Sequence, residues 1–171
     1  EDYAIKLATD LIDNFQNIYE DKWLNMMRNK LGLFGEEKKD KKLINDLLEW
    51  MKKNKADYTN TFCHLMDVKS NDEIYKKTDF LTWIDKWKLR SQLNNSSKEK
   101  QIKLMRKNNP IIIPRNHKVE EALKEANNGN LNKINRLLNI LDKPYDNQDI
   151  ANEYRLPAPE SKEKYQTFCG T

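Results

Sequence analysis

The 171-residue sequence lacks a long apolar run. No stretch approaches the roughly 18 apolar residues that a membrane-spanning helix requires, and its start shows no signal-peptide pattern; we therefore expect a cytoplasmic protein without a membrane partner. Only 37% of the residues are hydrophobic, 34% are charged, and the mean hydropathy is −0.98. A chain this polar either forms a thin helical array or reserves its apolar surface for a partner. Because it begins at Glu1 within a helical pattern, we expect it to be a piece of a longer polypeptide.

Glycine and histidine are scarce. The four glycines are too few and too scattered to form a loop that cradles phosphates. Cys63 and His64 are adjacent, but neighbouring side chains on a helix point about 100° apart, and no second pair supplies the remaining ligands of an ion. We therefore predict no metal site in this chain.

The two cysteines are too few, in so polar a chain, to suggest a disulfide framework. Cys63 follows Phe62 on a predicted helix and is expected to be a small buried thiol. Cys169 lies near the end of the sequence, in a segment without a helical pattern, where a side chain can be reached. An accessible thiol can oxidise or exchange disulfides if its pKa is lowered. Cys169 is thus the candidate redox residue, and an inert terminal cysteine is the alternative.

Charge of one sign is not concentrated anywhere. The 31 cationic residues are offset by 27 anionic ones, and the two signs alternate along the chain. This pattern is typical of a solvated helix surface, whereas a nucleic-acid interface needs basic residues gathered on one face. The four tryptophans recur at helical spacing among aliphatic residues, which favours core or docking positions over a platform for stacking bases. We expect no nucleic-acid partner.

The periodicity predicts helices throughout, so the expected fold class is all-α. Residues 3–31 form one long amphipathic pattern whose apolar stripe we expect to be buried, and Gly32 and Gly35 end it. Asp57 and Ser97 are suitable N-caps for two of the later helices. The remaining patterns of this multi-helix array, residues 1–107, start near residues 40, 57, 78 and 97.

The second part of the chain is expected to contain a connector, a helical hairpin and a tail. Residues 108–115 form the connector, because proline disfavours a helical conformation in the residue before it. Residues 116–143 form the hairpin, which breaks at Asn128-Gly129 and resumes with Asn130 as a cap. Residues 144–171 are an extended, proline-containing tail.

Four residues flank the connector and are candidate structural anchors: Asn109, Pro110, Arg115 and Asn116. A guanidinium held next to a rigid connector can bond several carbonyls or a carboxylate at once. We expect these residues to tie the connector to neighbouring helix ends; a role in binding substrate is the alternative.

Several motifs recur in one order along the chain. They are the run Met27–Leu33, the helix start Asp57–Phe62, the helix with Trp83, Trp87 and Arg90, the run Met105–Pro110 followed by Arg115-Asn116, and Pro144-Tyr145. This order resembles the carboxyl end of the selenoprotein O-like (SelO/YdiU) proteins. The resemblance implies a protein-kinase-like parent that transfers AMP from ATP to hydroxyl side chains of proteins, using Mg or Mn.

In that family the nucleotide- and metal-binding residues precede the matching segment. The resemblance therefore implies no catalytic, cofactor-binding or metal residue within this chain. It implies a carboxyl-terminal helical domain that buttresses the kinase-like catalytic lobe of the same polypeptide, is inactive alone and exposes an apolar patch where that lobe docks. The partners would be that lobe and the protein substrates of the parent.

One departure from the family concerns the tail. Many members end in a cysteine followed closely by another cysteine or selenocysteine, whereas here Gly170 and Thr171 follow Cys169. We therefore expect no redox pair within the tail, and a redox role of Cys169 would need a partner elsewhere in the parent. Two other interpretations stay open: a stand-alone helical protein-interaction module and, less favoured by the charge pattern, a basic nucleic-acid-binding domain.

Overall fold

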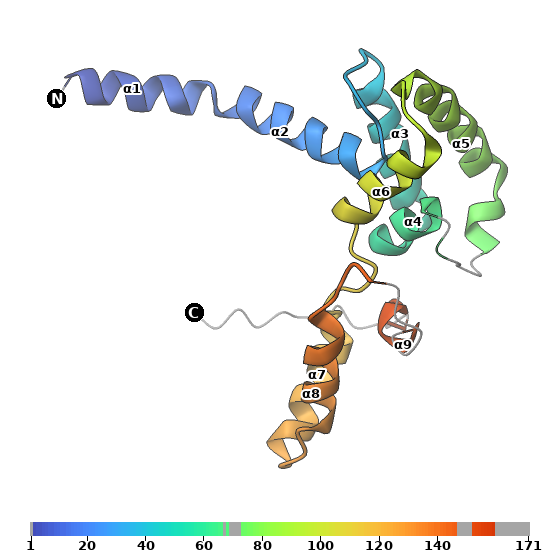
Figure 1. The fold of residues 1–171 in the computed structure, drawn as a ribbon. Coiled ribbons are helices and arrows are strands. Elements are labelled where there is room, and N and C mark those ends of the chain that lie inside the picture. Colours follow the sequence, from blue (N-terminus) through green and yellow to red (C-terminus); the bar gives the residue numbers. More distant parts are fainter. Residues whose placement is uncertain (1, 67, 69–72, 147–151, 160–171) are drawn as a thin grey trace. The chain divides into compact units, whose positions relative to one another are not determined.

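The computed structural model describes residues 2–66, 68, 73–146 and 152–159, and within them every regular element is a helix (Figure 1). The predicted all-α class is confirmed. The chain divides into two compact units, residues 1–111 and 112–171, and the boundary falls inside the predicted connector. Over the described residues, no helix has both the length and the apolar content that a bilayer crossing would need.

The first unit contains six α-helices and two short 3₁₀ helices among its described residues. They are α1 (Asp2–Asp13), α2 (Phe15–Lys30), α3 (Asp40–Asn54), α4 (Tyr58–Leu65), η1 (Glu73–Lys76), α5 (Thr78–Ser91), η2 (Gln92–Asn94) and α6 (Lys98–Asn108). The predicted long helix is present as α1 and α2, with Asn14 at their junction (Figure 1). The helical bonding continues there, because the Asn14 amide donates to the Asp10 carbonyl and the Ile18 amide donates to the Asn14 carbonyl, each at 3.1 Å.

The apolar stripe of α1 and the first half of α2 is exposed, which differs from the burial that its periodicity predicts. Tyr3 is 80% exposed and Phe15 is 65% exposed. Only at Met27, which is 1% exposed, does α2 enter the core. The periodicity thus predicted an amphipathic helix correctly, but the described residues leave its apolar face exposed.

The core of the first unit is built around aromatic rings. The ring centroids of Trp50 on α3 and Phe80 on α5 lie 4.5 Å apart, and Phe62 of α4 is 1% exposed. The indole Nε1 of Trp83 donates to the Leu43 carbonyl at 2.9 Å, so this large side chain is both packed and hydrogen-bonded. Cys63 is completely buried, as predicted.

The turn after α2 requires glycine at position 32. Its φ is +66°, a conformation that disfavours residues with a Cβ. A Cβ built there would lie 2.6 Å from Cγ of Gln101 and 2.8 Å from Cγ of Met105, both on α6. Gly32 therefore allows the α2 turn to approach α6 more closely than any side chain would permit.

The predicted caps of α4 and α6 are confirmed. An Asp57 carboxylate oxygen accepts the Asn60 amide at 2.8 Å, and Ser97 Oγ accepts the Lys100 amide at 3.3 Å. Each satisfies one of the amides that lack a partner at a helix start.

The second unit contains the helical hairpin, formed by α7 (Asn116–Asn127) and α8 (Asn132–Leu141), and the short helix α9 (Asn152–Arg155). Gly129 has a φ of +84° in the turn. Leu131, not the predicted Asn130, is the N-cap residue of α8, although Asn130 Oδ1 does accept the Asn132 amide at 3.1 Å. The Ile112 amide donates to the Pro144 carbonyl at 3.1 Å, which joins the start of this unit to the end of its hairpin. In the tail, α9 interrupts the extended course that was predicted.

Candidate functional site

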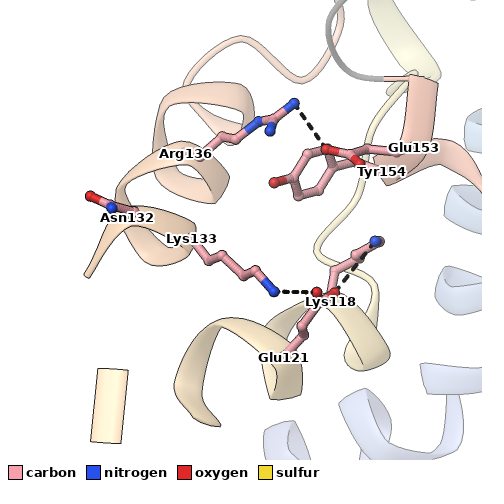
Figure 2. Close-up of a pocket in the computed structure, with 7 residues that line it drawn as sticks. All are labelled: Lys118, Glu121, Asn132, Lys133, Arg136, Glu153 and Tyr154. Carbon is pink, nitrogen blue, oxygen red and sulfur yellow. Dashed lines mark hydrogen bonds and ion pairs between the residues drawn. The ribbon is translucent and has the colours of Figure 1, made fainter. Parts of the chain in front are cut away.

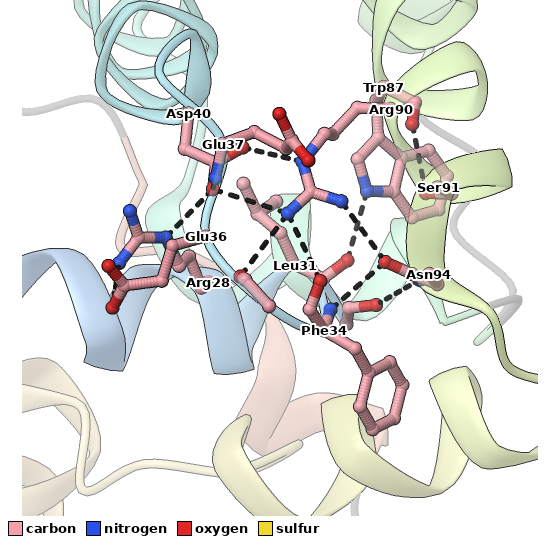
Figure 3. A network of polar contacts seen from close by, with 12 residues as sticks. Arg28, Leu31, Phe34, Glu36, Glu37, Asp40, Trp87, Arg90, Ser91 and Asn94 are labelled. Carbon is pink, nitrogen blue, oxygen red and sulfur yellow. Dashed lines mark hydrogen bonds and ion pairs between the residues drawn. The ribbon is translucent and has the colours of Figure 1, made fainter.

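A buried charged cluster among the described residues of the first unit is centred on Asp40, the first residue of α3 (Figure 3). Its carboxylate is fully buried and accepts hydrogen bonds from Arg28 Nε at 2.8 Å and from Arg90 Nε at 2.6 Å. Arg90 Nη2 lies 3.2 Å from the same carboxylate, and the Glu37 amide donates to it at 3.0 Å. Three segments distant in the sequence therefore converge on one carboxyl group.

Burial opposes ionisation of the Asp40 carboxyl group. The hydrogen bonds from Arg90, the Glu37 amide and Arg28 outweigh burial and hold the pKa of Asp40 below its ordinary value. The group therefore stays ionised and is already bonded on both oxygens. Such a carboxylate has no free lone pair aimed at a substrate, so its geometry is that of a structural pair and not of a general base.

The same cluster holds the loop after α2. Arg90 Nη2 donates to the carbonyls of Phe34 and Gly35 at 3.2 and 3.3 Å. Asn94 accepts the Phe34 amide at 2.9 Å and donates to the Gly32 carbonyl at 2.9 Å (Figure 3). These bonds give backbone groups of the loop hydrogen-bond partners and fix the path of the chain between α2 and α3.

Asn109, one of the four predicted anchors, is 1% exposed and joins two helix ends. Its Nδ2 donates to the Lys30 carbonyl at the end of α2 and to the Met105 carbonyl on α6, each at 2.8 Å. The Pro110 carbonyl faces Cys63, whose Sγ lies 3.8 Å away. Bonding of this kind gives partners to carbonyls that have none within their own helices.

The other predicted site residues lie elsewhere. Arg115 is the N-cap residue of α7, and its carbonyl accepts the amides of Lys118 and Val119. Asn116 is the first residue of α7. A tie between the Arg115 guanidinium and a helix end stays a prediction. Cys169 lies outside the described residues.

A small pocket of about 210 Å³ lies in the second unit, between the hairpin and α9 (Figure 2). Its polar lining includes Lys118 and Glu121 on α7, Lys133 and Arg136 on α8, and Glu153 on α9. Tyr154 is the aromatic member: its ring centroid lies 5.6 Å from both Lys118 Nζ and Arg136 Cζ. Sequence reasoning did not single out any of these residues, because the pocket depends on α9.

The cations of this pocket are already paired. Lys133 Nζ lies 2.5 Å from Glu121 and 2.6 Å from Glu125, and Arg136 lies 2.9 Å from Glu153. The hydrogen bonds that Lys133 donates to Glu121 and Glu125 raise the pKa of Lys133, and the bond that Glu121 accepts from Lys133 lowers the pKa of Glu121. A nucleotide phosphate would have to displace these carboxylates. The pocket is also smaller than the roughly 300–1,000 Å³ of ordinary ligand sites.

A wider, open hollow of about 600 Å³ lies in the first unit along α5 and α6. Ile84, Trp87 and Ile102 are among the apolar residues that line it, and His64, another lining residue, stacks on Tyr75 with ring centroids 4.1 Å apart.

The described part of the chain contains no group of three or more His, Cys, Asp or Glu side chains that could hold a metal ion. The described residues therefore offer no set of ligands for a divalent metal.

Comparison with known proteins gives these helices a context. A family model described as "Protein adenylyltransferase SelO" matches residues 4–142. The chain belongs to the SelO family. The Arg28–Asp40–Arg90 cluster and the pocket residues of α7 and α8 all lie within the part that matches the SelO family, whereas α9 lies beyond it.

Curated relatives in the SelO family are similar along the whole chain. A protein nucleotidyltransferase YdiU of Pelagibacter ubique is 55% identical over 174 residues, covering 100% of this chain and 36% of the relative. Proteins of the same description from Nitrosococcus oceani and Alkaliphilus metalliredigens are 41% and 43% identical, covering 98% and 100% of this chain and 34% and 35% of those relatives. The chain thus spans about a third of the length of the relatives it matches.

The Asp40 cluster was not predicted, although the sequence contains a signal for it. Asp40 precedes Leu43 and Leu47 at the spacing of the apolar face of α3. Arg90 and Asn94 likewise continue the face begun by Phe80, Trp83 and Trp87. A charged side chain that occupies an apolar position at helical spacing is a candidate for a buried ion pair.

Proposed function

We propose that these residues form the helical carboxyl-terminal part of a protein nucleotidyltransferase and support a catalytic lobe that lies elsewhere in the polypeptide. The described family activity and the names of the relatives support a nucleotidyltransferase parent. The main support for a buttressing role is the exposed apolar face of α1 and α2. The chain spans only about a third of its relatives' length, so a longer polypeptide could cover this face. Such a face is typical of an element that docks on another surface.

The proposed reaction of the parent is transfer of AMP from ATP to a hydroxyl side chain of a protein substrate. The hydroxyl oxygen attacks the α-phosphorus, pyrophosphate leaves, and the hydroxyl proton passes to a base. ATP and Mg or Mn would be held by residues of a kinase-like lobe, since the described residues of this chain hold no metal-binding cluster and the cations of its charged pocket are paired. We place the parent in the cytoplasm, where ATP is available.

A rigid support affects such a reaction without touching ATP. Transfer between bound phosphates and a hydroxyl depends on placing the reacting groups within a fraction of an ångström. The Asp40 cluster gives the first unit that rigidity, because it joins α2, the following loop, α3 and α5 through buried charged bonds. The supporting domain would transmit its rigidity through the surface that it shares with the lobe.

The test is AMP transfer by the full-length parent from ATP labelled on its α-phosphate. Wild type is compared with Asp40→Asn, which weakens the support. The matched control is Asp46→Asn, which removes an exposed ion pair on the same helix. We expect slower transfer in Asp40→Asn at a temperature where the variant is still folded, and wild-type transfer in Asp46→Asn. Full-rate AMP transfer by a parent from which the 171 residues of this chain have been deleted would contradict the proposal.

A further inference from the structure

Six large apolar side chains cover one side of α1 and the start of α2, and we name them the α1–α2 stripe: Leu7, Leu11, Ile12, Phe15, Ile18 and Tyr19. Their exposed fractions range from 41% to 73%. At about 100° per residue they occupy an arc roughly 140° wide and about 18 Å long. The rings of Phe15 and Tyr19 stack with centroids 6.2 Å apart, so the stripe is one continuous surface.

Along α1 and the start of α2, the side opposite the stripe is polar. Lys6, Thr9, Asp10, Asp13 and Asn17 lie there and are exposed. The exposure of the stripe is therefore not a general feature of an exposed helix with mixed composition. One side is built to be covered, and the other is built to face water.

The width of the arc and the charges around it narrow the choice of partner. A coiled-coil seam is narrower than this arc: a second copy that paired along the apolar seam 5, 8, 12, 15 and 19 would leave Leu7, Leu11 and Ile18 uncovered. A membrane surface would favour lysine and arginine on the polar face, whereas residues 3–22 contain four acidic residues and two lysines. An arc this wide fits burial in a groove of a globular body.

The relatives are long enough to contain such a globular body outside the part that this chain matches. The chain spans 36% of the Pelagibacter ubique protein, so nearly two thirds of that polypeptide lies outside the matched part. We infer that the α1–α2 stripe is buried in an apolar groove formed by the remainder of the same polypeptide. This inference rests on the proposed function only in needing the longer polypeptide, and not on the reaction that it catalyses.

The anchoring of α2 explains how such a contact would be rigid. Met27 and Leu31 are buried at its end, and Arg28 is bonded to Asp40. The stripe is thus on the free part of a helix whose other end is held in the core. A body that grips the stripe is coupled mechanically to the charged cluster of the first unit.

The direct test is thiol labelling of the full-length protein. Leu11→Cys places a thiol on the stripe, and the matched control Asn17→Cys places one on the polar side of the same helices. The label bound by the unsubstituted protein is subtracted from that bound by each variant. In denaturant both introduced thiols should react at the same rate. In the native protein we expect the thiol of Leu11→Cys to react at least about ten-fold more slowly than that of Asn17→Cys, because only the stripe is covered.

Equal native rates at the two sites would overturn the inference. Protection of Leu11→Cys that disappears on dilution, together with a dimer in sedimentation, would also overturn it by assigning the groove to a second copy. Protection that needs phosphatidylserine vesicles would do the same in favour of a membrane. Slow labelling in a protein that transfers no AMP would leave the docking intact and contradict only the proposed reaction.

A second measurement covers the case in which a cysteine reports only local motion. Leu11→Lys with Phe15→Lys adds two charges to the stripe, and Thr9→Lys with Asn17→Lys adds the same two to the polar side. In the full-length protein we expect the first pair to lower the midpoint of thermal unfolding by about 5 °C or more, because a charge cannot be buried unpaired. Equal shifts in both double variants would overturn the inference.

Discussion

Replacing Asp40 by asparagine removes the negative charge from the centre of the first unit while keeping the size of the side chain. Two guanidinium groups, those of Arg28 and Arg90, then remain buried or nearly so, with 11% and 8% of their side chains exposed and no anion between them at the position of Asp40. Removing one partner of a buried ion pair costs about 3–5 kcal/mol. For a unit of this size, that loss corresponds to a fall of about 10–20 °C in the midpoint of thermal unfolding.

The assay is denaturant unfolding of wild type, Asp40→Asn and Asp46→Asn, followed by circular dichroism. Asp46 pairs with Lys42 at 3.0 Å and Lys86 at 3.9 Å on the surface, so its replacement should cost less than about 1 kcal/mol. A loss in Asp40→Asn as small as that in Asp46→Asn would refute the argument that buried charge holds the loop between α2 and α3.

The pH dependence of the same variants gives a sign that can be checked. Because the pKa of Asp40 is lowered in the folded state, its stabilisation is complete above the ordinary carboxyl pKa of about 4 and is lost as the pH falls through the folded value. The difference in unfolding free energy between wild type and Asp40→Asn should therefore stay constant above about pH 5 and shrink below about pH 4. A difference that grows on acidification would contradict this assignment.

Three local features can be tested by substitution, each followed by thermal unfolding or hydrogen exchange. Gly32→Ala combines a positive φ with contact against α6 and should cost more than about 2 kcal/mol, whereas Gly35→Ala, with a φ of +69° and no neighbour within 4 Å, should cost only the strain of about 1–2 kcal/mol; equal losses would contradict the close approach to α6. Asp57→Ala removes the cap of α4 and should cost about 0.5–2 kcal/mol, more than Ser97→Ala, whose bond is longer and exposed. Tyr154→Ala removes the ring between two cations and should increase hydrogen exchange in α9 but not in the hairpin; unchanged exchange in α9 would contradict its docking through that ring.

Helical periodicity predicted most of the fold. It located the long amphipathic helix, the caps at Asp57 and Ser97, and the glycines that end helices, because each of these depends on a few residues close together in the sequence. It did not predict α9, whose four residues are too short for a periodic pattern and which rests on contacts with the hairpin. Local pattern does not encode such contacts.

The charged cluster around Asp40 was not predicted for a similar physical reason. The Asp40 cluster joins residues 12 and 50 positions apart, and pairing at that range follows from packing and not from spacing. Conversely, the stripe on α1 and α2 was expected to be buried because its pattern is that of a buried helix face. The pattern reports that the face is made to be covered, but it does not say by which part of a polypeptide.

The central claim is that these helices support a nucleotide-binding body and hold no reaction centre of their own. The most direct test supplies the 171-residue chain and the full-length parent separately with Mg, ATP labelled on its α-phosphate and an acceptor protein. We expect label in the acceptor protein only when the full-length parent is present. Labelling of the acceptor by the 171-residue chain alone would contradict it.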